Sequence, residues 1–240
     1  MLKASAPSLS DIARFKQEYA ILTRLNIDGV IIPYEIIDAP EGLAIVQEDF
    51  PGRSLKDLLS QKKPFNLQDF FTIAITTARI LGDIHQVNVV HKDIKPANIL
   101  ATLSLDLIKI TDFGISSIFS GENEEIFRRD VIEGTLVYMS PEQTGRLNRD
   151  LDYRTDLYSL GIMFYELLTG VVPFQSDDPM EIIYSHIARR PVSVSEVNPE
   201  IPETISAIID KLLAKTPEER YQNAYGLMHE AVGILIALFR

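Results

Sequence analysis

The chain has 240 residues, 46% of them hydrophobic, which is enough to bury a sizeable core in one domain or two small lobes. Its 23 Lys and Arg against 34 Asp and Glu give a net charge of −11, which argues against a general nucleic-acid binder because such proteins neutralise phosphates. The absence of cysteine excludes disulfides, thiolate nucleophiles and Cys-ligated zinc.

The first 50 residues predict one helix and two strands. Ser8-Leu-Ser-Asp11 has the spacing of a capping box and opens a helix over 11–25. VIIPYEII at 30–37 and LAIVQEDF at 43–50 are rich in Ile and Val and are separated by turn-forming residues, which indicates two strands joined by a turn. Pro51-Gly52 then forms a hinge-like break.

Helices dominate the rest of the chain. Ser54-Leu-Lys-Asp57 opens a short helix, and Asn66-Leu-Gln-Asp69 caps a long one that runs to about Gln86. Residues 116–133 show little periodicity, which indicates a mobile loop. Further helices are expected at 155–169 (ended by Gly170), 178–190, 203–214 and 223–239, with one more capping box at Thr216-Pro-Glu-Glu219.

No segment predicts insertion into a membrane. The first ten residues, MLKASAPSLS, lack the apolar run of a signal peptide. The longest apolar candidate, AVGILIALF at 231–239, is too short to span a bilayer. We therefore expect a soluble cytoplasmic protein that does not bind nucleic acid and does not insert into a membrane.

The polar stretch HKDIKPAN, residues 91–98 (the polar loop), lies between the apolar runs NVV and ILA. A hairpin formed by NIL and the later run LIKI would return Asp112 to the side of Asn98. An amide and a carboxylate that converge make an oxygen-rich site suited to Mg²⁺. Asp93 would then face an incoming hydroxyl and Lys95 would neutralise a transferring phosphate, which are the parts that phosphoryl transfer requires.

These residues and four later motifs resemble the protein kinase family. The loop matches H-R-D-x-x-x-x-N with Lys92 in place of Arg, and Asp112-Phe-Gly114 follows intact. GTLVYMSPE at 134–142 resembles the end of an activation segment, DLYSLG at 156–161 the start of the following helix, and KTPEER at 215–220 the late segment that pairs Arg220 with Glu142. The resemblance implies an α+β, two-lobe fold, with an incomplete small β lobe at 1–50 and a complete, mainly helical large lobe at 51–240.

The resemblance implies a protein serine/threonine kinase that uses ATP and Mg²⁺ and acts on a protein with a Ser or Thr acceptor. Asp93 would orient the hydroxyl as a base and Lys95 would contact the γ-phosphate. Asn98 and Asp112 would bind magnesium. Thr135 would contact Asp93 and, with Lys95, favours Ser or Thr over Tyr as the acceptor.

The same resemblance places the nucleotide base beside the end of the second strand. Gln47 would be the gatekeeper, the backbone from Glu48 to Phe50 would read adenine, and Leu100 would form the floor of the pocket. The alternative is that residues 47–50 are an ordinary strand end, because backbone contacts leave no signature in the side chains. Glu18 sits where the family's helix glutamate belongs.

Two features of the sequence depart from the family pattern. No G-x-G-x-x-G occurs before residue 50, and Lys3 can pair with Glu18 only if MLK ends the third strand. We favour a strand lysine that precedes Met1, which makes Glu18 a solvated carboxylate here. Because a phosphate-covering loop positions ATP, we expect this chain to have weak or no activity by itself.

Lys92 is the third departure from the pattern. The family's Arg at this position often gathers a phosphorylated activation loop, and Lys pairs less specifically because it is a point charge. Ser116, Ser117 and Ser120 are therefore weak candidate phosphosites, and the alternative is that they are plain loop residues.

A narrower resemblance links three segments to the Ser/Thr kinase module of bacterial hybrid sensor kinases, which implies further sensor and regulatory domains as partners. The segments are SLSDIARFKQEYAIL, the stretch from GTLVYMSPE to ELLTG, and PMEIIYSHIARRPVS. Two other interpretations stay open. One is a pseudokinase-like scaffold, against which the intact Asp93, Asn98 and Asp112 count. The other, which we rank last, is a small-molecule phosphotransferase.

Overall fold

The computed structural model describes residues 9–39, 42–62, 64–114, 116–118, 136–147 and 150–239. Its α-helices are α1 (Leu9–Leu22), α2 (Leu55–Lys62), α3 (Leu67–Gln86), α4 (Arg154–Thr169), α5 (Pro179–Ala188), α6 (Val194–Val197), α7 (Glu203–Leu212) and α8 (Ala224–Leu238). Its strands are β1 (Pro33–Ala39), β2 (Gly42–Gln47), β3 (Arg53–Ser54), β4 (Val89–Val90), β5 (Ile99–Ala101), β6 (Ile108–Ile110) and β7 (Ser117–Ile118). Four single-turn 3-10 helices are η1 (Pro96–Asn98), η2 (Leu136–Tyr138), η3 (Glu142–Thr144) and η4 (Pro217–Glu219).

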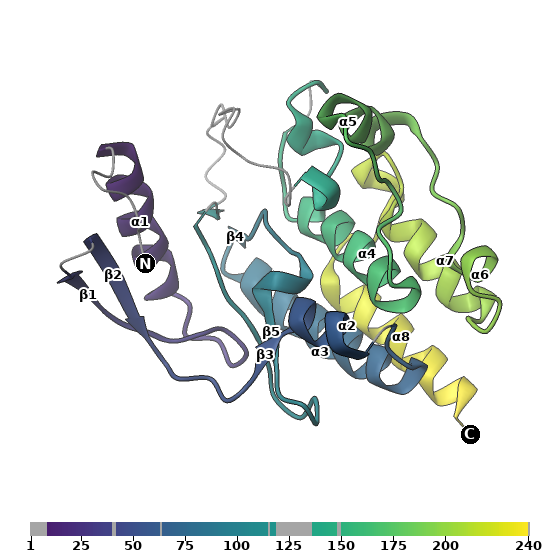
Figure 1. Ribbon diagram of the computed structural model, residues 1–240, viewed down its shortest axis with the longest axis horizontal. Coiled ribbons are helices and arrows are strands. Elements are labelled where there is room, and N and C mark those ends of the chain that lie inside the picture. The colour runs from purple at the N-terminus through teal and green to yellow at the C-terminus, as the bar shows by residue number, and fades with distance from the viewer. Residues whose placement is uncertain are drawn as a thin grey trace.

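The molecule has a small part, residues 9–47, and a large part, residues 53–239. Figure 1 shows α1, β1 and β2 standing to one side of the body formed by the other helices. The fold is α+β, with the strands of the small part and a mainly helical large part, as the sequence predicts. The division into two domains at residue 50 stays a prediction.

The small part is an antiparallel hairpin packed beside one helix. β1 and β2 pair with an irregularity between Pro33 and Glu35, and the Tyr19 hydroxyl of α1 donates to the backbone oxygen of Tyr34 at 3.1 Å. Both strands lie a few residues away from the predicted ranges. The start of the first predicted strand is used differently, because Val30 forms a parallel bridge with Ile110 of β6.

Local capping chemistry sets the helix starts of the large part. The Ser54 hydroxyl donates to Asp57 Oδ2 at 2.6 Å and accepts from the Asp57 N–H at 3.1 Å, which confirms the predicted box at the start of α2. Asn66 accepts from the Asp69 N–H at 2.9 Å and caps α3. Gly170 ends α4 with φ +78°, a conformation that suits glycine.

The structure differs from the sequence analysis of local structure in three places. Thr216 makes no capping bond, and Pro217–Glu219 forms a 3-10 turn in place of a capped helix. α6 was not predicted, because four residues carry too little periodicity to be recognised. Residues 117 and 118 of the expected mobile loop form β7, which pairs with β4, while the capping residue Ser8 and residues 119–133 lie outside the described part.

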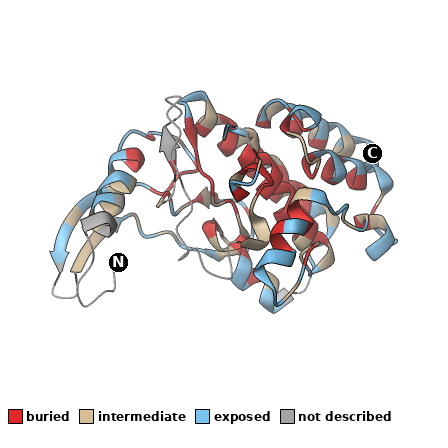
Figure 2. Cartoon of the chain, turned by 90° about the horizontal axis from the view of Figure 1, so that it is seen from above, coloured by how far each residue is buried: buried red, intermediate tan, exposed pale blue. Residues whose placement is uncertain are grey.

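The core lies in the large part, around α3 and α4. Nearly every residue of α4 is buried, and Figure 2 shows the buried residues concentrated in the centre of the large part while the hairpin is largely exposed or half-buried. α4 and α7 approach so closely that a Cβ added at Gly161 would lie 2.7 Å from Leu212 Cβ. In the part of the chain that is described, no helix is long and apolar enough to cross a bilayer.

We predict that Gly161→Ala lowers the free energy of unfolding by about 1–3 kcal/mol, because the added methyl group overpacks the contact with Leu212. The matched control is Gly233→Ala on the exposed side of α8, where no atom lies within 4 Å of the added Cβ. There the loss of backbone freedom in the unfolded chain should stabilise by about 0.5–1 kcal/mol. Urea denaturation measures both, and equal effects would contradict the close approach of α4 and α7.

Candidate active site

A short hairpin brings the polar loop and the Asp112-Phe-Gly114 segment together. β5 pairs with β6 so that Ile99 lies opposite Ile110, and the Thr111 N–H donates to the Asn98 backbone oxygen at 3.0 Å. The next residue, Asp112, is exposed and has a left-handed backbone with φ +66°. The structure therefore places Asn98 and Asp112 at the same edge of the hairpin, as the spacing predicts.

Side chains of the polar loop converge on Asp93. Its Oδ2 accepts from Lys95 Nζ at 2.6 Å and from Asn98 Nδ2 at 3.0 Å, and Asn98 Nδ2 also donates to the Asp93 backbone oxygen at 2.9 Å. The other carboxylate oxygen, Oδ1, is buried and has no hydrogen-bond partner among the described residues. Asp93 thus has one oxygen held by cationic and amide donors and one left for a further donor.

The buried carboxylate of Asp156 in α4 holds the polar loop through hydrogen bonds to its backbone. Asp156 accepts from the backbone N–H groups of His91 at 2.9 Å and Lys92 at 2.7 Å, and it pairs with His85 Nε2 at 2.9 Å. Complete burial by itself would raise the pKa of Asp156, but the bond from His85 and the neighbouring donors outweigh it and hold the pKa below its ordinary value. Lys92 keeps a left-handed backbone with φ +68° within this arrangement.

Sequence reasoning did not identify Asp156 and His85 as site residues. Asp156 opens the DLYSLG motif, so the motif itself was the available signal, but its spacing does not show that the carboxylate turns inward. His85 is an ordinary last-turn residue of α3 in the sequence.

The His91 ring connects the polar loop with the Asp112 segment. Its Nδ1 accepts from the Asp93 N–H at 3.2 Å, and its Nε2 lies 3.1 Å from the Thr111 backbone oxygen. These two bonds assign a neutral ring with the proton on Nε2. The ring also packs against Phe113, with 4.6 Å between centroids.

Glu18 of α1 reaches the Asp112 segment and corrects the expectation of a solvated carboxylate. It is half-buried, and a Cβ added at Gly114 would lie 3.5 Å from its Oε2. Burial, and secondly the negative charge of Asp112, raise the pKa of Glu18 to about 7, which the Phe113 backbone N–H partly offsets. Lys3, its candidate partner, lies outside the described residues.

Residues 136–144 are tied both to the polar loop and to the core. Gln143 Nε2 donates to the Lys92 backbone oxygen at 2.8 Å. Glu142 and Arg220 form a fully buried, bidentate ion pair with distances of 2.7 and 2.9 Å, which confirms the predicted pairing. The Thr155 hydroxyl adds a bond of 2.9 Å to Glu142 Oε1. Thr135, one of the predicted site residues, lies outside the described part of the chain.

A buried histidine of α5, His186, lies next to residues 136–144. His186 Nδ1 lies 3.0 Å from the Tyr158 hydroxyl, and its ring packs edge-on against Phe174. Burial, and secondly the nearby Lys215 ammonium, lower the pKa of His186 to about 3. The histidine is therefore neutral in the folded protein across the physiological range.

The residues predicted to contact the nucleotide base lie at the end of β2, in the segment that follows it and in β5. Gln47 is exposed at the end of β2, and the Glu48 N–H donates to the Ile32 backbone oxygen at 2.9 Å. The Glu48 carboxylate forms an ion pair with Lys109 of β6. Phe50 and Leu100 are half-buried, the latter in β5.

Ser116 is not accessible as a phosphosite, which corrects that prediction. Its hydroxyl is buried and donates to the His91 backbone oxygen at 3.1 Å. The Ser117 side chain and the whole of Ser120 lie outside what the structure describes.

The donors at the hairpin edge fit magnesium better than a metal held by protein alone. Among the described residues, no group of three or more His, Cys, Asp or Glu could hold a metal ion. The Asn98 side-chain oxygen and the Asp112 carboxylate would supply two oxygen ligands. That is the number typical of Mg²⁺ sites that take their remaining ligands from phosphate and water.

Comparisons with known proteins agree with this geometry. Residues 1–232 match the family model described as protein kinase domain. A probable serine/threonine-protein kinase of Clostridium perfringens is 35% identical over 213 residues, which cover 89% of this chain and 30% of that protein. Serine/threonine-protein kinase PknB of Mycobacterium tuberculosis is 31% identical over 225 residues, which cover 92% of this chain and 36% of PknB. The chain thus spans about a third of the length of these relatives.

We predict that Glu142→Gln lowers the free energy of unfolding by about 3–5 kcal/mol, because it leaves the buried Arg220 charge without its partner. Glu218→Gln is the matched control. Its carboxylate is 69% exposed and lies 3.5 Å from Arg154, so its loss should cost less than about 1 kcal/mol. Chemical denaturation compares the two, and a loss at Glu142 as small as that at Glu218 would contradict the role of the buried pair.

We predict that His186 makes the protein sensitive to acid. The unfolded chain binds a proton at His186 near pH 6.5 and the folded chain only near pH 3, so stability falls as the pH drops through this window. His186→Gln should be less stable at pH 7, since it loses the bond to Tyr158, but its stability should decline less between pH 7 and 5. Urea midpoints at several pH values measure this slope, and the exposed His229→Gln should leave it unchanged.

Proposed function

The chain belongs to the protein kinase family, and on that premise we propose that it transfers the γ-phosphate of ATP to a serine or threonine hydroxyl of a protein. The relatives named above are serine/threonine-protein kinases, which supports this choice of acceptor. Because the chain spans about a third of their length, the activity and partners of the whole protein are part of the proposal. Further sensor domains remain a prediction from the sequence.

The observation that carries the proposal is the asymmetry of Asp93. Its Oδ2 is fixed by Lys95 and Asn98, whereas Oδ1 is buried and has no partner among the described residues. A buried carboxylate oxygen that lacks a donor favours a ligand that brings one. A substrate hydroxyl meets this requirement, so Asp93 would orient it and accept its proton during transfer.

Lys95 and a magnesium ion held by Asn98 and Asp112 would supply the positive charge that a phosphate requires. Lys95 reaches Asp93 at 2.6 Å, so its ammonium group would lie beside both the hydroxyl and the transferring phosphate. The Asn98 side-chain oxygen and the Asp112 carboxylate would hold Mg²⁺. When bound, magnesium neutralises the negative charge on the phosphate oxygens.

The base of the nucleotide would lie against the segment that joins the two parts. The backbone from Glu48 to Phe50 would read adenine, Gln47 would act as gatekeeper, and Leu100 would form the floor. Glu18 would lie at the phosphate end, near Asp112. Thr135 would complete the acceptor site beside Asp93.

We expect Asp93→Asn to lower the rate of phosphate transfer by at least about 100-fold, because the amide cannot accept the proton, while the affinity for Mg·ATP changes by less than about twofold. Calorimetry measures the affinity. Transfer of the labelled phosphate from ATP to myelin basic protein is followed in a single turnover with the chain in excess, so that even a slow rate is measured.

The control for this experiment is Asp38→Asn, an exposed carboxylate of β1, which should alter neither quantity. Transfer that survives in Asp93→Asn would contradict the role of Asp93. If the wild-type chain did not bind Mg·ATP at millimolar concentration, the result would favour the scaffold interpretation.

A further inference from the structure

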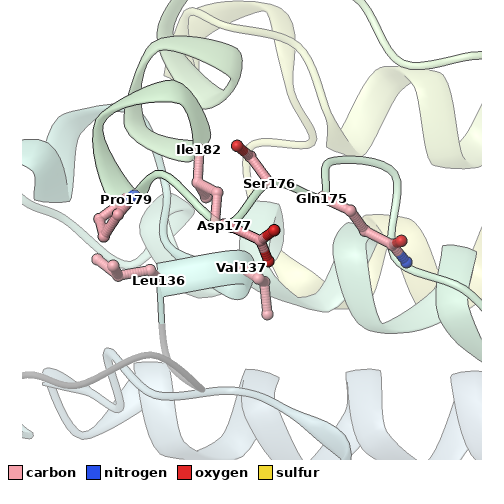
Figure 3. A pocket seen from close by; sticks show the side chains of 7 residues that line it. All are labelled: Leu136, Val137, Gln175, Ser176, Asp177, Pro179 and Ile182. Carbon is pink, nitrogen blue, oxygen red and sulfur yellow. The ribbon is translucent and has the colours of Figure 1, made fainter.

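A cavity of about 630 Å³ lies beside η2, between it and the start of α5. It is lined by Leu136, Val137, Gln175, Ser176, Asp177, Pro179 and Ile182. Four of these residues are apolar and three are polar. Figure 3 shows Asp177 and Ile182 directed from the α5 side toward η2.

Three carboxylates surround the start of α5, and two of them are already engaged. Asp178 Oδ1 accepts from the Met180 N–H at 2.8 Å, and Glu181 Oε2 accepts from the Ser176 hydroxyl at 2.6 Å. Asp177 is exposed, and it forms no hydrogen bond or ion pair within the described ranges. It is therefore the carboxylate of the cavity that is available to a ligand.

The charges around the cavity favour a cation. The positive end of the α5 dipole is already met by Asp178, and the net charge of the chain is −11, so an anionic group would be repelled. The guanidinium group of the neighbouring Arg146 contacts Met180 Sδ at 3.3 Å. In the described part of the chain it forms no ion pair with the three carboxylates.

The cavity belongs to the same segment that contacts the polar loop. Leu136 and Val137 lie in η2, which the Tyr138 hydroxyl anchors to Glu166 of α4 at 2.6 Å. Six residues after Val137, Gln143 donates to the Lys92 backbone oxygen, next to Asp93. A peptide whose hydroxyl lies at Asp93 would therefore have neighbouring residues within reach of this segment.

We propose that Asp177 is a specificity-determining residue that selects protein substrates with a lysine or arginine a few residues from the acceptor hydroxyl. This inference rests on the proposed function. The aliphatic stem of the basic side chain would pack on Leu136, Val137 and Ile182, and its charged head would pair with Asp177. A long cationic side chain with an apolar stem matches both halves of the lining.

Peptide binding tests the proposal without requiring turnover. Labelled peptides with one Ser acceptor carry Lys, norleucine or Glu at each flanking position in turn, and fluorescence anisotropy gives their affinities for the chain with Mg·ADP. Because Asp177 is exposed, we expect Lys to bind about 3- to 5-fold more tightly than norleucine at the selected position, and less so at high salt.

Variants at Asp177 identify the residue responsible. Asp177→Asn should remove the preference for Lys, and Asp177→Lys should turn it into a preference for Glu, while Asp38→Asn should keep the wild-type pattern. Thermal unfolding of each variant checks that it is folded. The proposal is overturned if Asp177→Asn keeps the preference, if the wild-type chain has none, or if affinity follows the total peptide charge regardless of position.

Including Asp93→Asn separates this inference from the proposed function. That variant should retain the peptide preference while losing transfer, which supports both ideas. Normal transfer together with a preference unaffected by Asp177→Asn would overturn the role of Asp177 alone. Transfer that does not depend on Asp93 would overturn the proposed function, whatever the peptides show.

Discussion

The buried carboxylate of Asp156 is the interaction on which the site depends. It lies within α4, the most completely buried helix, and it accepts the backbone N–H groups of His91 and Lys92. A fully buried carboxylate is tolerable only when its oxygens are satisfied, so the polar loop and the core stabilise each other. The His91 ring is bonded in turn to the Thr111 backbone oxygen, so Asp156 also helps to position Thr111 and the adjoining Asp112.

The Lys92 peptide is bonded both to α4 and to residues 136–144. Its N–H donates to Asp156, and its carbonyl oxygen accepts from Gln143, so the residue is held from both sides in a left-handed conformation. Such a conformation is unfavourable for a side chain other than glycine and persists only where the surroundings enforce it. The buried bidentate pair of Glu142 with Arg220 contributes to that enforcement, because it fixes the residue next to Gln143.

Features encoded by short-range spacing were predictable, and features set by distant contacts were not. The caps of α2 and α3 and the convergence of Asn98 with Asp112 follow from turn and hairpin geometry over a few residues. The pairing of Arg220 with Glu142 came from the resemblance to a family. The burial of Ser116, the surroundings of Glu18 and the inward direction of Asp156 depend on segments far away in sequence, so no local pattern indicates them.

The exposed hairpin of the small part implies that the molecule is not one cooperative unit. The described side chains of β1 and β2 are all half-buried or exposed, and a two-stranded hairpin has little stability by itself. It therefore opens at a lower free energy than the core around α3 and α4, and its amide hydrogens exchange first. The edge that we propose to face the nucleotide therefore belongs to the less stable part of the protein. A ligand that spans both parts would have to order the hairpin as well as bind it.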